Sequence, residues 1–393
     1  MGHFDVDSLV RLRHDLHAVP EVGLHLPATQ ARLLDALDGL GLEITLGRDL
    51  SSITAVLRGR ATSDRERKVV LLRGDMDGLP LAEQSGEPFA STNSAMHACG
   101  HDLHMAGVVG AAQWLADHVE DLPGDVVFMF QPGEEGADGA RRMIDEGVLE
   151  AAGRRPDMAF AIHVWASTFP SGTFVVRPGA IMAASDPLDV TVLGRGGHGS
   201  APHRAADPVP AMAEMITALQ VMLARHFDLF DPALITVGRV EAGQARNVIP
   251  DTAHFEATMR SFSPAARDRL WELVPRVLDG VAASHGVAVE HSMTRLYPVT
   301  SNHAGPTRLV EQAVTDLFGT ERLVRPENPM SAAEDFSKVL LEVPGAFVLL
   351  GAAPVDVDPA TAANNHSASV RYSDDVIGDA ARLLAELAVR SLA

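Results

Sequence analysis

Residues 125–147 read DVVFMFQPGEEGADGARRMIDEG, a short apolar run followed by a turn and a helical pattern. The run DVVFMF at 125–130 predicts a buried strand, and residues 137–147 predict a helix. The same alternation continues on both sides, with strands expected at 52–58, 69–73, 158–164 and 346–351 and helices at 6–18, 28–40, 102–118, 305–318, 333–341 and 375–391. Short apolar strands between helices are typical of an α/β domain, in which helices flank a central sheet.

The middle of the chain shows a different order of elements. Its pattern is strand, helix, strand, strand, helix, strand, at 187–193, 208–226, 234–241, 252–261, 264–285 and 286–293. This βαββαβ order is that of a ferredoxin-like unit. We therefore expect a discontinuous α/β domain made of residues 1–185 and 296–393, with a ferredoxin-like domain inserted at 186–295.

Length and composition restrict the class of protein. A chain of 393 residues with 46% apolar and 21% charged residues predicts two or three packed domains. The formal net charge of −20 argues against nucleic acid as a partner, because an acidic surface repels phosphate. The single cysteine cannot form an internal disulfide, which fits a cytoplasmic location. The sequence also shows no signal-peptide pattern and no apolar run of membrane-spanning length, so no membrane is expected as a partner.

Pairs of acidic residues follow two of the expected strands. Asp75 and Asp77, in RGDMDGLP at 73–80, stand at i and i+2, so both side chains point the same way in extended chain. Glu134 and Glu135, in FQPGEEG at 130–136, are adjacent at a strand-to-loop turn. A metal hydrolase needs one carboxylate as a ligand and another as a general base on water. The alternatives are a solvated turn for the aspartates and a helix N-terminus for the glutamates.

The only cysteine stands among potential metal ligands. Cys99 and His101, in HACGHD at 97–102, can face one point, and a thiolate with an imidazole suits zinc and related divalent ions. A buried structural cysteine and a cysteine nucleophile with a histidine base are the alternatives. His163 ends an apolar strand and His366 lies in a polar loop, and each is ordinary alone. The metal hypothesis rests on four strand-end sites in one domain, because active residues cluster there in such sheets.

The inserted segment has polar features of its own. GRGGHGSAPH at 194–203 contains His198 but lacks the glycine order of a phosphate-binding loop. Asn247 and Arg260 offer an amide and a guanidinium, and arginine is the usual forked partner of a carboxylate. The alternative for Arg260 is a surface cation on a strand.

Nine motifs together resemble a known family. They are HAVPE, RGDMDGLP, HACGHDLH, FQPGEEG, IHVW, GGHGSAPH, NVIPD, AEDF and HSAS, in order from about residue 10 to residue 370. The set is similar to the aminoacylase/carboxypeptidase superfamily of metal hydrolases. Within it, the chain resembles the N-acyl-amino-acid amidohydrolase branch, which includes hippurate hydrolases and indole-acetyl-amino-acid hydrolases. Two departures are His25 and Leu26, where the family usually has an acidic pair, and Asn365, where an apolar residue is common.

The resemblance implies a role for each matching residue. One or two divalent ions (Zn, Mn, Ni or Co) would be bound by Cys99, His101, Glu135, His163 and His366, with Cys99 able to bridge two ions. Glu134 would be the general base and Asp77 would orient a ligand. The substrate's carbonyl and free carboxylate would be held by His198, Asn247 and Arg260. The inserted domain would serve as lid and as the interface of a homodimer or higher homo-oligomer, in which His198 can complete the partner's site.

The activity implied is metal-dependent hydrolysis of the amide bond of N-acyl amino acids in the cytoplasm. A dipeptidase and a deacylase of a diaminopimelate precursor are the nearest alternatives within the same superfamily. A thiol-dependent amidase with Cys99 as nucleophile and a non-catalytic binding protein stay open from the residues alone. Spacing assigns no role to His97 and Asp102, for which support of a neighbouring ligand is a hypothesis, and His104 is expected to face the start of the following helix.

Overall fold

The computed structural model describes residues 4–62 and 66–393 and divides into two compact units. The large unit comprises Met1–Ile181, Ser301–Asn328 and Asp335–Ala393, and the small unit comprises Met182–Thr300 and Pro329–Glu334. The small unit therefore extends beyond the 186–295 expected from the sequence. The added segment belongs to it because the Ala183 amide donates to the carbonyls of Met330 and Ala332, at 3.1 and 2.9 Å.

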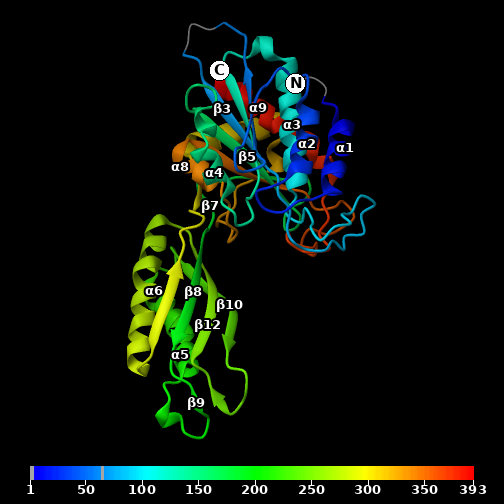
Figure 1. Ribbon diagram of the computed structural model, residues 1–393. Coiled ribbons are helices and arrows are strands. Elements are labelled where there is room, and N and C mark those ends of the chain that lie inside the picture. Colours follow the sequence, from blue (N-terminus) through cyan, green and yellow to red (C-terminus); the bar gives the residue numbers. More distant parts are fainter. Residues whose placement is uncertain (1–3, 63–65) are drawn as a thin grey trace. The chain divides into compact units, whose positions relative to one another are not determined.

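An eight-stranded sheet forms the core of the large unit (Figure 1). Its order is β1 (Glu43–Leu46), β2 (Ile53–Arg58), β4 (Asp125–Gln131), β3 (Val69–Asp75), β5 (Met158–Trp165), β16 (Gly345–Gly351), β6 (Phe174–Val175) and β15 (Leu323–Val324). The four central strands β4, β3, β5 and β16 run parallel, whereas β2 and β6 are antiparallel to their central neighbours. Apolar side chains bury the central strands on both faces, as expected for parallel strands covered by helices.

Helices cover both faces of this sheet. They are α1 (Val6–His17), α2 (Pro27–Leu37), α3 (His101–Asp117), α4 (Gly139–Asp145), α7 (Ala304–Phe318), α8 (Ser337–Glu342) and α9 (Ile377–Leu392). Figure 1 shows α4 and α8 on one side of the strands and α1, α2 and α3 on the other, where α3 packs against α9. The prediction of an α/β fold with a central sheet and flanking helices is confirmed. The helix expected at 333–341 begins only at Ser337, because the preceding Asp335 turns inward and accepts hydrogen bonds from Arg73, Gln131 and the Ala140 amide.

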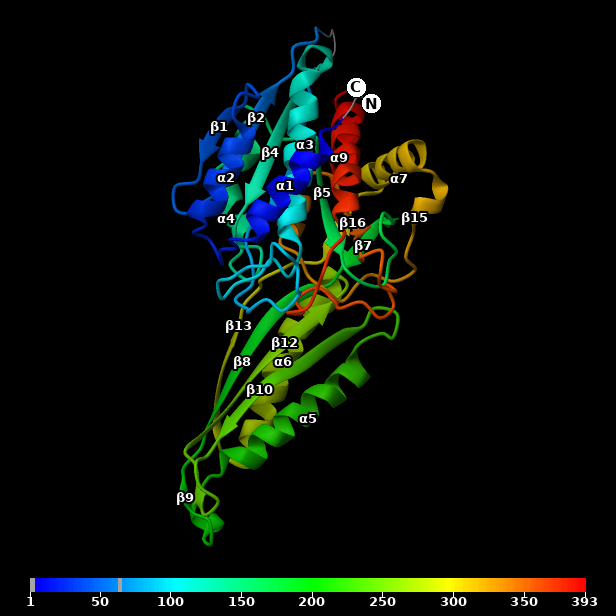
Figure 2. The ribbon, with the colours of Figure 1, turned by 90° about the vertical axis from the view of Figure 1, so that its right-hand side faces the viewer.

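The small unit has the chain order βαββαβ. Its elements are β8 (Ala184–Leu193), α5 (Pro208–His226), β10 (Ala233–Ala242), β12 (Thr252–Ser261), α6 (Pro264–His285) and β13 (Ala288–Met293). The strands form an antiparallel sheet in the order β10-β12-β8-β13, and α5 and α6 bury apolar side chains against it (Figure 2). Both helices begin at a capping side chain followed by proline: Asp207 accepts from the Val209 amide and Ser263 from the Ala266 amide.

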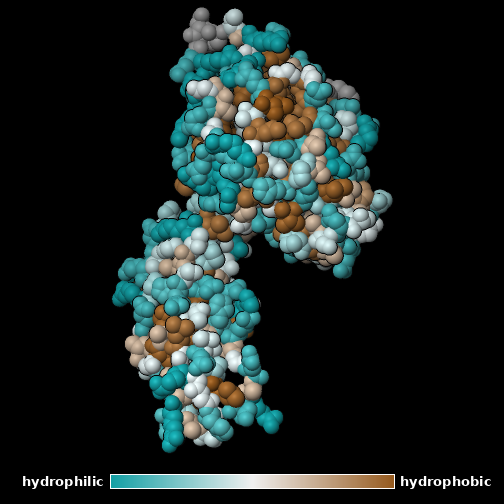
Figure 3. All heavy atoms as spheres, viewed as in Figure 1, coloured by the Kyte–Doolittle hydropathy of each residue, from teal (hydrophilic) through white to brown (hydrophobic). Residues whose placement is uncertain are grey.

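Shorter pieces complete the structure. At one end of the small unit β9 (Gly197–His198) pairs with β11 (Val248–Ile249), and β7 (Gly179–Met182) pairs with β14 (Thr300–Asn302). The visible surface is largely hydrophilic with scattered apolar patches (Figure 3). Within the part of the chain that the structure describes, none of the helices combines the length and apolarity needed to span a bilayer.

Candidate metal centre

The predicted ligands of the large unit come together where three parallel strands end. Asp75 is the last residue of β3, Glu134 and Glu135 follow β4, and His163 lies near the end of β5. Cys99 and His101 reach the same place from the start of α3. Gly100 between them has a φ of +83°, and an added Cβ would lie 2.3 Å from a Val164 methyl carbon. Only glycine fits there. The sharp turn at Gly100 lets the Cys99 thiol and the His101 imidazole both point toward the other potential ligands.

The sulfur of Cys99 lies close to four other potential ligands. It is 3.4 Å from His163 Nε2 and 3.3 Å from His366 Nε2. Ligand atoms of Cys99, His101 and Glu135 all lie within 4.8 Å of one another. His366 Nε2 is also 3.1 Å from Glu135 Oε1. In tetrahedral zinc sites the sulfur–nitrogen and nitrogen–oxygen edges are about 3.4–3.6 Å, so these spacings fit a metal centre.

The histidines present lone pairs toward this sulfur. His163 Nδ1 donates to the Val164 carbonyl at 2.8 Å and His101 Nδ1 donates to the Asp77 carbonyl at 2.7 Å, which leaves each Nε2 as the coordinating atom. Burial and the neighbouring His104 hold the pKa of His163 well below its ordinary value, so its ring is neutral. Hydrogen bonds to Cys99 and then Glu135 raise the pKa of His366 to about 10. The cluster therefore attracts positive charge, as a site for divalent ions requires.

Asp77 fixes the loop that carries both glutamates. Its two carboxylate oxygens accept the backbone N–H groups of Glu134 and Glu135, at 3.0 and 3.1 Å. Its own carbonyl accepts the proton of His101 Nδ1. The buried Asp77 thus orients two potential ligands, His101 and Glu135. It also orients the adjacent Glu134, which is 5% exposed.

The loop with His366 is tied to the loop with Cys99. His366 has a φ of +70°, a strained conformation for a residue other than glycine, and such strain is concentrated at functional sites. The His366 amide and the Tyr372 hydroxyl both donate to the Ala98 carbonyl at 2.8 Å. Asn365, the departure from the family pattern, accepts from the Ala166 amide and donates to the Val164 carbonyl, at 3.0 and 3.1 Å. The asparagine therefore joins this loop to the end of β5.

The predicted substrate residues lie in the small unit, at its two ends. His198 and Asn247 are exposed neighbours on the paired β9 and β11 hairpins, where the Gly199 amide donates to the Asn247 carbonyl at 2.9 Å. Arg260 lies near the other end of β12 and donates to the Ser331 carbonyl at 2.6 Å. Arg260 is eight residue steps along the strand from Thr252, a distance of about 27 Å. The small unit of one chain therefore cannot bring all three side chains to one small molecule.

A buried polar group behind the centre gives Asp102 a role that spacing did not assign. Asp102 Oδ2 accepts from Arg13 Nε at 2.7 Å and lies 2.8 Å from His17 Nδ1. His17 Nε2 lies 3.1 Å from Glu83. Arg13 and His17 are spaced i, i+4 on α1, so the group anchors that helix to the start of α3. The neighbouring His97 is buried, and its ring nitrogens have no hydrogen-bond partner among the described residues.

The contacts of His17 with Asp102 and Glu83 predict that the stability of the fold depends on pH. Burial opposes protonation, but Asp102 and Glu83 raise the pKa of His17 from 6.5 to about 9. Because the folded state binds this proton more tightly, its contribution is complete below pH 6.5 and is lost as the pH rises through 9. The shift corresponds to about 3 kcal/mol.

We expect the free energy of unfolding, measured by urea titration in a chelator, to fall less between pH 6.5 and 9 in His17→Gln than in the natural chain. His118→Gln, at the far end of α3, serves as the control. Equal pH slopes in all three proteins would contradict the assignment.

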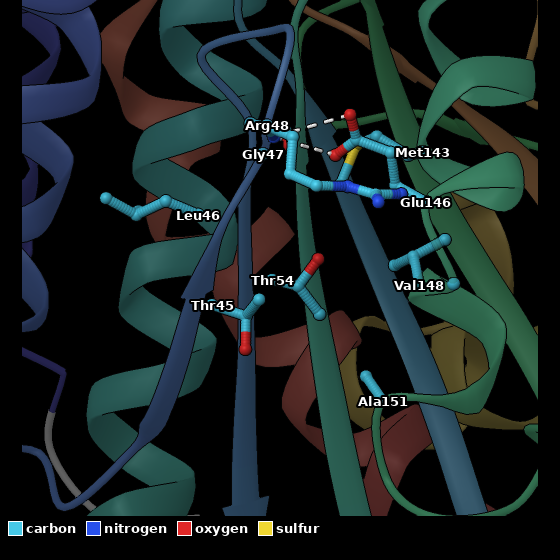
Figure 4. Close-up of a pocket in the computed structure, with 11 residues that line it drawn as sticks. Thr45, Leu46, Gly47, Arg48, Thr54, Met143, Glu146, Val148 and Ala151 are labelled. Atoms are coloured by element: carbon cyan, nitrogen blue, oxygen red, sulfur yellow. Dashed lines mark hydrogen bonds between the residues drawn. The ribbon is translucent and has the colours of Figure 1, made fainter.

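One hollow of the large unit lies apart from these residues (Figure 4). It has a volume of about 190 Å³ and is bounded by β1, β2 and the end of α4. Glu146 closes it by accepting the Arg48 and Asp49 amides, at 3.1 and 3.3 Å. None of the predicted site residues lines it, so the candidate site is the strand-end cluster.

Comparison with known proteins identifies the family of the chain. The family model described as peptidase family M20/M25/M40 matches residues 71–390. The thermostable carboxypeptidase 2 of Saccharolobus solfataricus is 33% identical over 98% of this chain and 95% of its own. The N-acetylcysteine deacetylase of Bacillus subtilis is 32% identical (97% and 96%), and the hippurate hydrolase of Campylobacter jejuni is 31% identical (97% and 96%). A crystal structure of a Bacillus subtilis protein, described as a dinuclear metal-binding peptidase, superposes with a TM-score of 0.82 at 30% identity, over 98% of each chain.

Proposed function

This chain belongs to peptidase family M20/M25/M40 and is a metal-dependent hydrolase, and from that premise we propose that it cleaves the amide bond of N-acyl amino acids. The observation that carries the proposal is the adjacent pair Glu134 and Glu135, whose backbone amides Asp77 holds and of which Glu135 lies in one group with Cys99 and His101. Such a pair supplies a ligand and a base from one loop. A non-catalytic binding protein has no use for the second carboxylate.

The residues of the large unit divide the work. The bound ions would be held by Cys99, His101, Glu135, His163 and His366. When bound, such ions polarise the scissile carbonyl and acidify water. Glu134 takes the proton of the attacking water and delivers it to the leaving nitrogen, so that one residue acts first as base and then as acid. Asp77 keeps Glu134 in place for both transfers, because it holds the backbone amide of that residue.

The relatives support an acyl amino acid as substrate. Two of them are named for removal of an acetyl or benzoyl group from an amino acid, as N-acetylcysteine deacetylase and hippurate hydrolase. The carboxypeptidase at 33% identity favours a second candidate, cleavage of a C-terminal amino acid from a peptide. Both candidates share one product, a free amino acid, and both require recognition of a carboxylate next to the scissile amide.

We assign recognition of that carboxylate to the small unit. Arg260 is half-buried and its guanidinium offers a fork of N–H donors. His198 and Asn247 lie beyond Thr252, which is about 27 Å from Arg260 along β12. We therefore propose that they serve the site of a second copy of the chain, in a homodimer or higher homo-oligomer.

The small unit offers a surface for such pairing. Its strand β10 is at the edge of the sheet and exposes Val240, while the nearby Leu229 and Phe230 are 89% and 97% exposed. An open strand edge with exposed apolar side chains favours association. Light scattering at several protein concentrations tests the oligomeric state, and a monomeric mass under all conditions would contradict it. We place the enzyme in the cytoplasm, because its one cysteine is a buried free thiol.

Loss of the Arg260 side chain should weaken the binding of substrates with a free carboxylate and of no others. A charged hydrogen bond contributes about 1.5–3 kcal/mol, so Arg260→Ala is expected to raise KM roughly 10- to 100-fold for N-acyl amino acids. The corresponding amides should be hydrolysed at the same rate by both proteins. Arg239→Ala is the matched control, since Arg239 lies on the neighbouring strand and pairs with Glu241 and Glu256. Equal losses on acids and amides would refute the role.

A hydrolysis panel tests the function itself. The protein is reconstituted separately with Zn²⁺, Mn²⁺, Ni²⁺ and Co²⁺ and offered N-acetyl, N-benzoyl and indole-acetyl amino acids, dipeptides and N-acetyldiaminopimelate. Release of the amino acid from acyl substrates supports the proposal. Preference for dipeptides would favour the carboxypeptidase candidate, and no turnover with any metal would refute both.

A further inference from the structure

The buried His104, which is not a predicted metal ligand, packs against the ring of His163, which is one. We propose that His104, fixed by Asp75, is a positioning residue that sets the orientation of His163 toward the sulfur of Cys99. The inference rests on the proposed metal centre, because it assigns a role relative to one of its ligands. His104 belongs to the first turn of α3 and is 4% exposed, and Asp75 is fully buried at the end of β3.

Two hydrogen bonds occupy both nitrogens of the His104 ring. Nδ1 lies 2.6 Å from Asp75 Oδ1. Nε2 accepts the backbone N–H of Val164 at 2.8 Å. Since a backbone amide can only donate, Nε2 carries the lone pair and Nδ1 carries the proton that Asp75 accepts. The ring therefore has no lone pair left for an ion, although its atoms lie within 4.8 Å of potential ligand atoms of Asp75, His101 and His163.

The bond to Val164 acts directly on the ligand. Val164 follows His163, and its carbonyl accepts the proton of His163 Nδ1 at 2.8 Å. Its amide is the group that His104 holds, so the backbone of Val164 is held at its N–H by His104 and at its carbonyl by His163. The two rings also pack together, with centroids 4.5 Å apart. A displacement of Val164 would turn His163 Nε2 away from Cys99, which lies 3.4 Å away.

Asp75 is in turn held by a buried group that reaches across the sheet. Arg73 Nη1 donates to Asp75 Oδ2 at 2.7 Å, and Arg73 also donates to Gln131 and Asp335, at 2.9 and 3.0 Å. These contacts leave Asp75 no freedom to follow a moving histidine. A continuous series of hydrogen bonds through Arg73, Asp75, His104 and Val164 thus fixes the ligand His163 relative to the sheet. Loss of a hydrogen-bond partner behind a metal ligand typically changes metal affinity about 10- to 100-fold.

Two conservative variants separate the contributions of the two His104 hydrogen bonds, to Asp75 and to Val164. In His104→Gln the amide oxygen can still accept the Val164 N–H, whereas in His104→Asn the shorter amide can reach only Asp75. Co²⁺ affinity is measured by calorimetry and the ligand field by visible absorption, on the full chain. We expect His104→Asn to bind one ion about 10- to 100-fold more weakly, with a changed spectrum, and His104→Gln to recover most of the loss.

The controls keep the outcomes distinct. His118→Asn alters the other end of α3, where the ring stacks on Trp114, and should bind Co²⁺ like the natural chain. Thermal unfolding in a chelator shows whether any variant has lost its fold. If the natural chain binds no Co²⁺, the proposed function fails. If it binds and His104→Asn binds equally well, only the inference fails. Equal losses in the Gln and Asn variants with lowered melting temperatures would also overturn it, because they indicate a purely structural role.

Discussion

Glu134→Gln is expected to lower kcat by about 10²- to 10⁴-fold while the protein keeps its metal. Glutamine has nearly the same shape, and its amide can remain where Asp77 holds the backbone of residue 134. It cannot accept a proton from water, so the step that Glu134 assists loses its base. The measurement pairs steady-state kinetics on the best acyl amino acid with metal analysis of the same samples.

The neighbouring carboxylate supplies the matched control. Glu135 lies 3.1 Å from His366 Nε2 and shares the Asp77 clamp through its own amide. Glu135→Gln should therefore lose metal affinity and activity together, and added metal should restore part of the rate. If Glu134→Gln instead loses metal and Glu135→Gln keeps it, the two roles are exchanged. Full activity of Glu134→Gln would remove the general base from the mechanism.

Cys99→Ala is expected to abolish activity by removing the ligand that lies closest to the other predicted ligands. The sulfur lies 3.4 Å from His163 Nε2 and 3.3 Å from His366 Nε2, and it also belongs to the group with His101 and Glu135. We expect the affinity for every bound ion to fall by more than about a hundredfold, since loss of a ligand exceeds loss of its supporting partner. Calorimetric titration of the metal-depleted protein measures this directly.

The same position separates metal catalysis from a thiol nucleophile. Chelation should inactivate the natural chain, and added Zn²⁺ or Mn²⁺ should restore it with Cys99 unmodified. Inactivation by alkylation that bound metal does not slow would favour the nucleophile. A Cys99→Ala protein that keeps two ions and loses only activity would contradict the bridging role.

The sequence predicts the strand ends well because their pattern is local. The run DVVFMF and the residues after it identify β4 and the loop of Glu134 and Glu135, and both lie where expected. Strands of two to four residues, such as β1, β6 and β15, are too short to show a period and were not predicted. The start of α8 was missed because Asp335 makes long-range contacts, with Arg73 and Gln131, that override its local propensity.

The residues that hold the predicted ligands in place were the least predictable part of the site. His104 was left unassigned because its partners, Asp75 and Val164, are 29 and 60 residues away in sequence. The one local sign is that HACGHDLH carries more histidines than a single ion needs. The separation of His198 from Arg260 was also hidden, because motif order along a chain says nothing of distance along a strand.

The bond between Tyr372 and Ala98 has a consequence for biosynthesis. It spans 274 residues, and His366 comes from the same late segment of the chain. The segment that contains His366 and Tyr372 must therefore be synthesised before it can pack against the loop of Cys99. Until then, Cys99 lacks its neighbour His366, whose Nε2 lies 3.3 Å from the sulfur in the folded structure. The predicted set of metal ligands is thus complete only after residues 366–372 have been synthesised and have folded against the loop of Cys99.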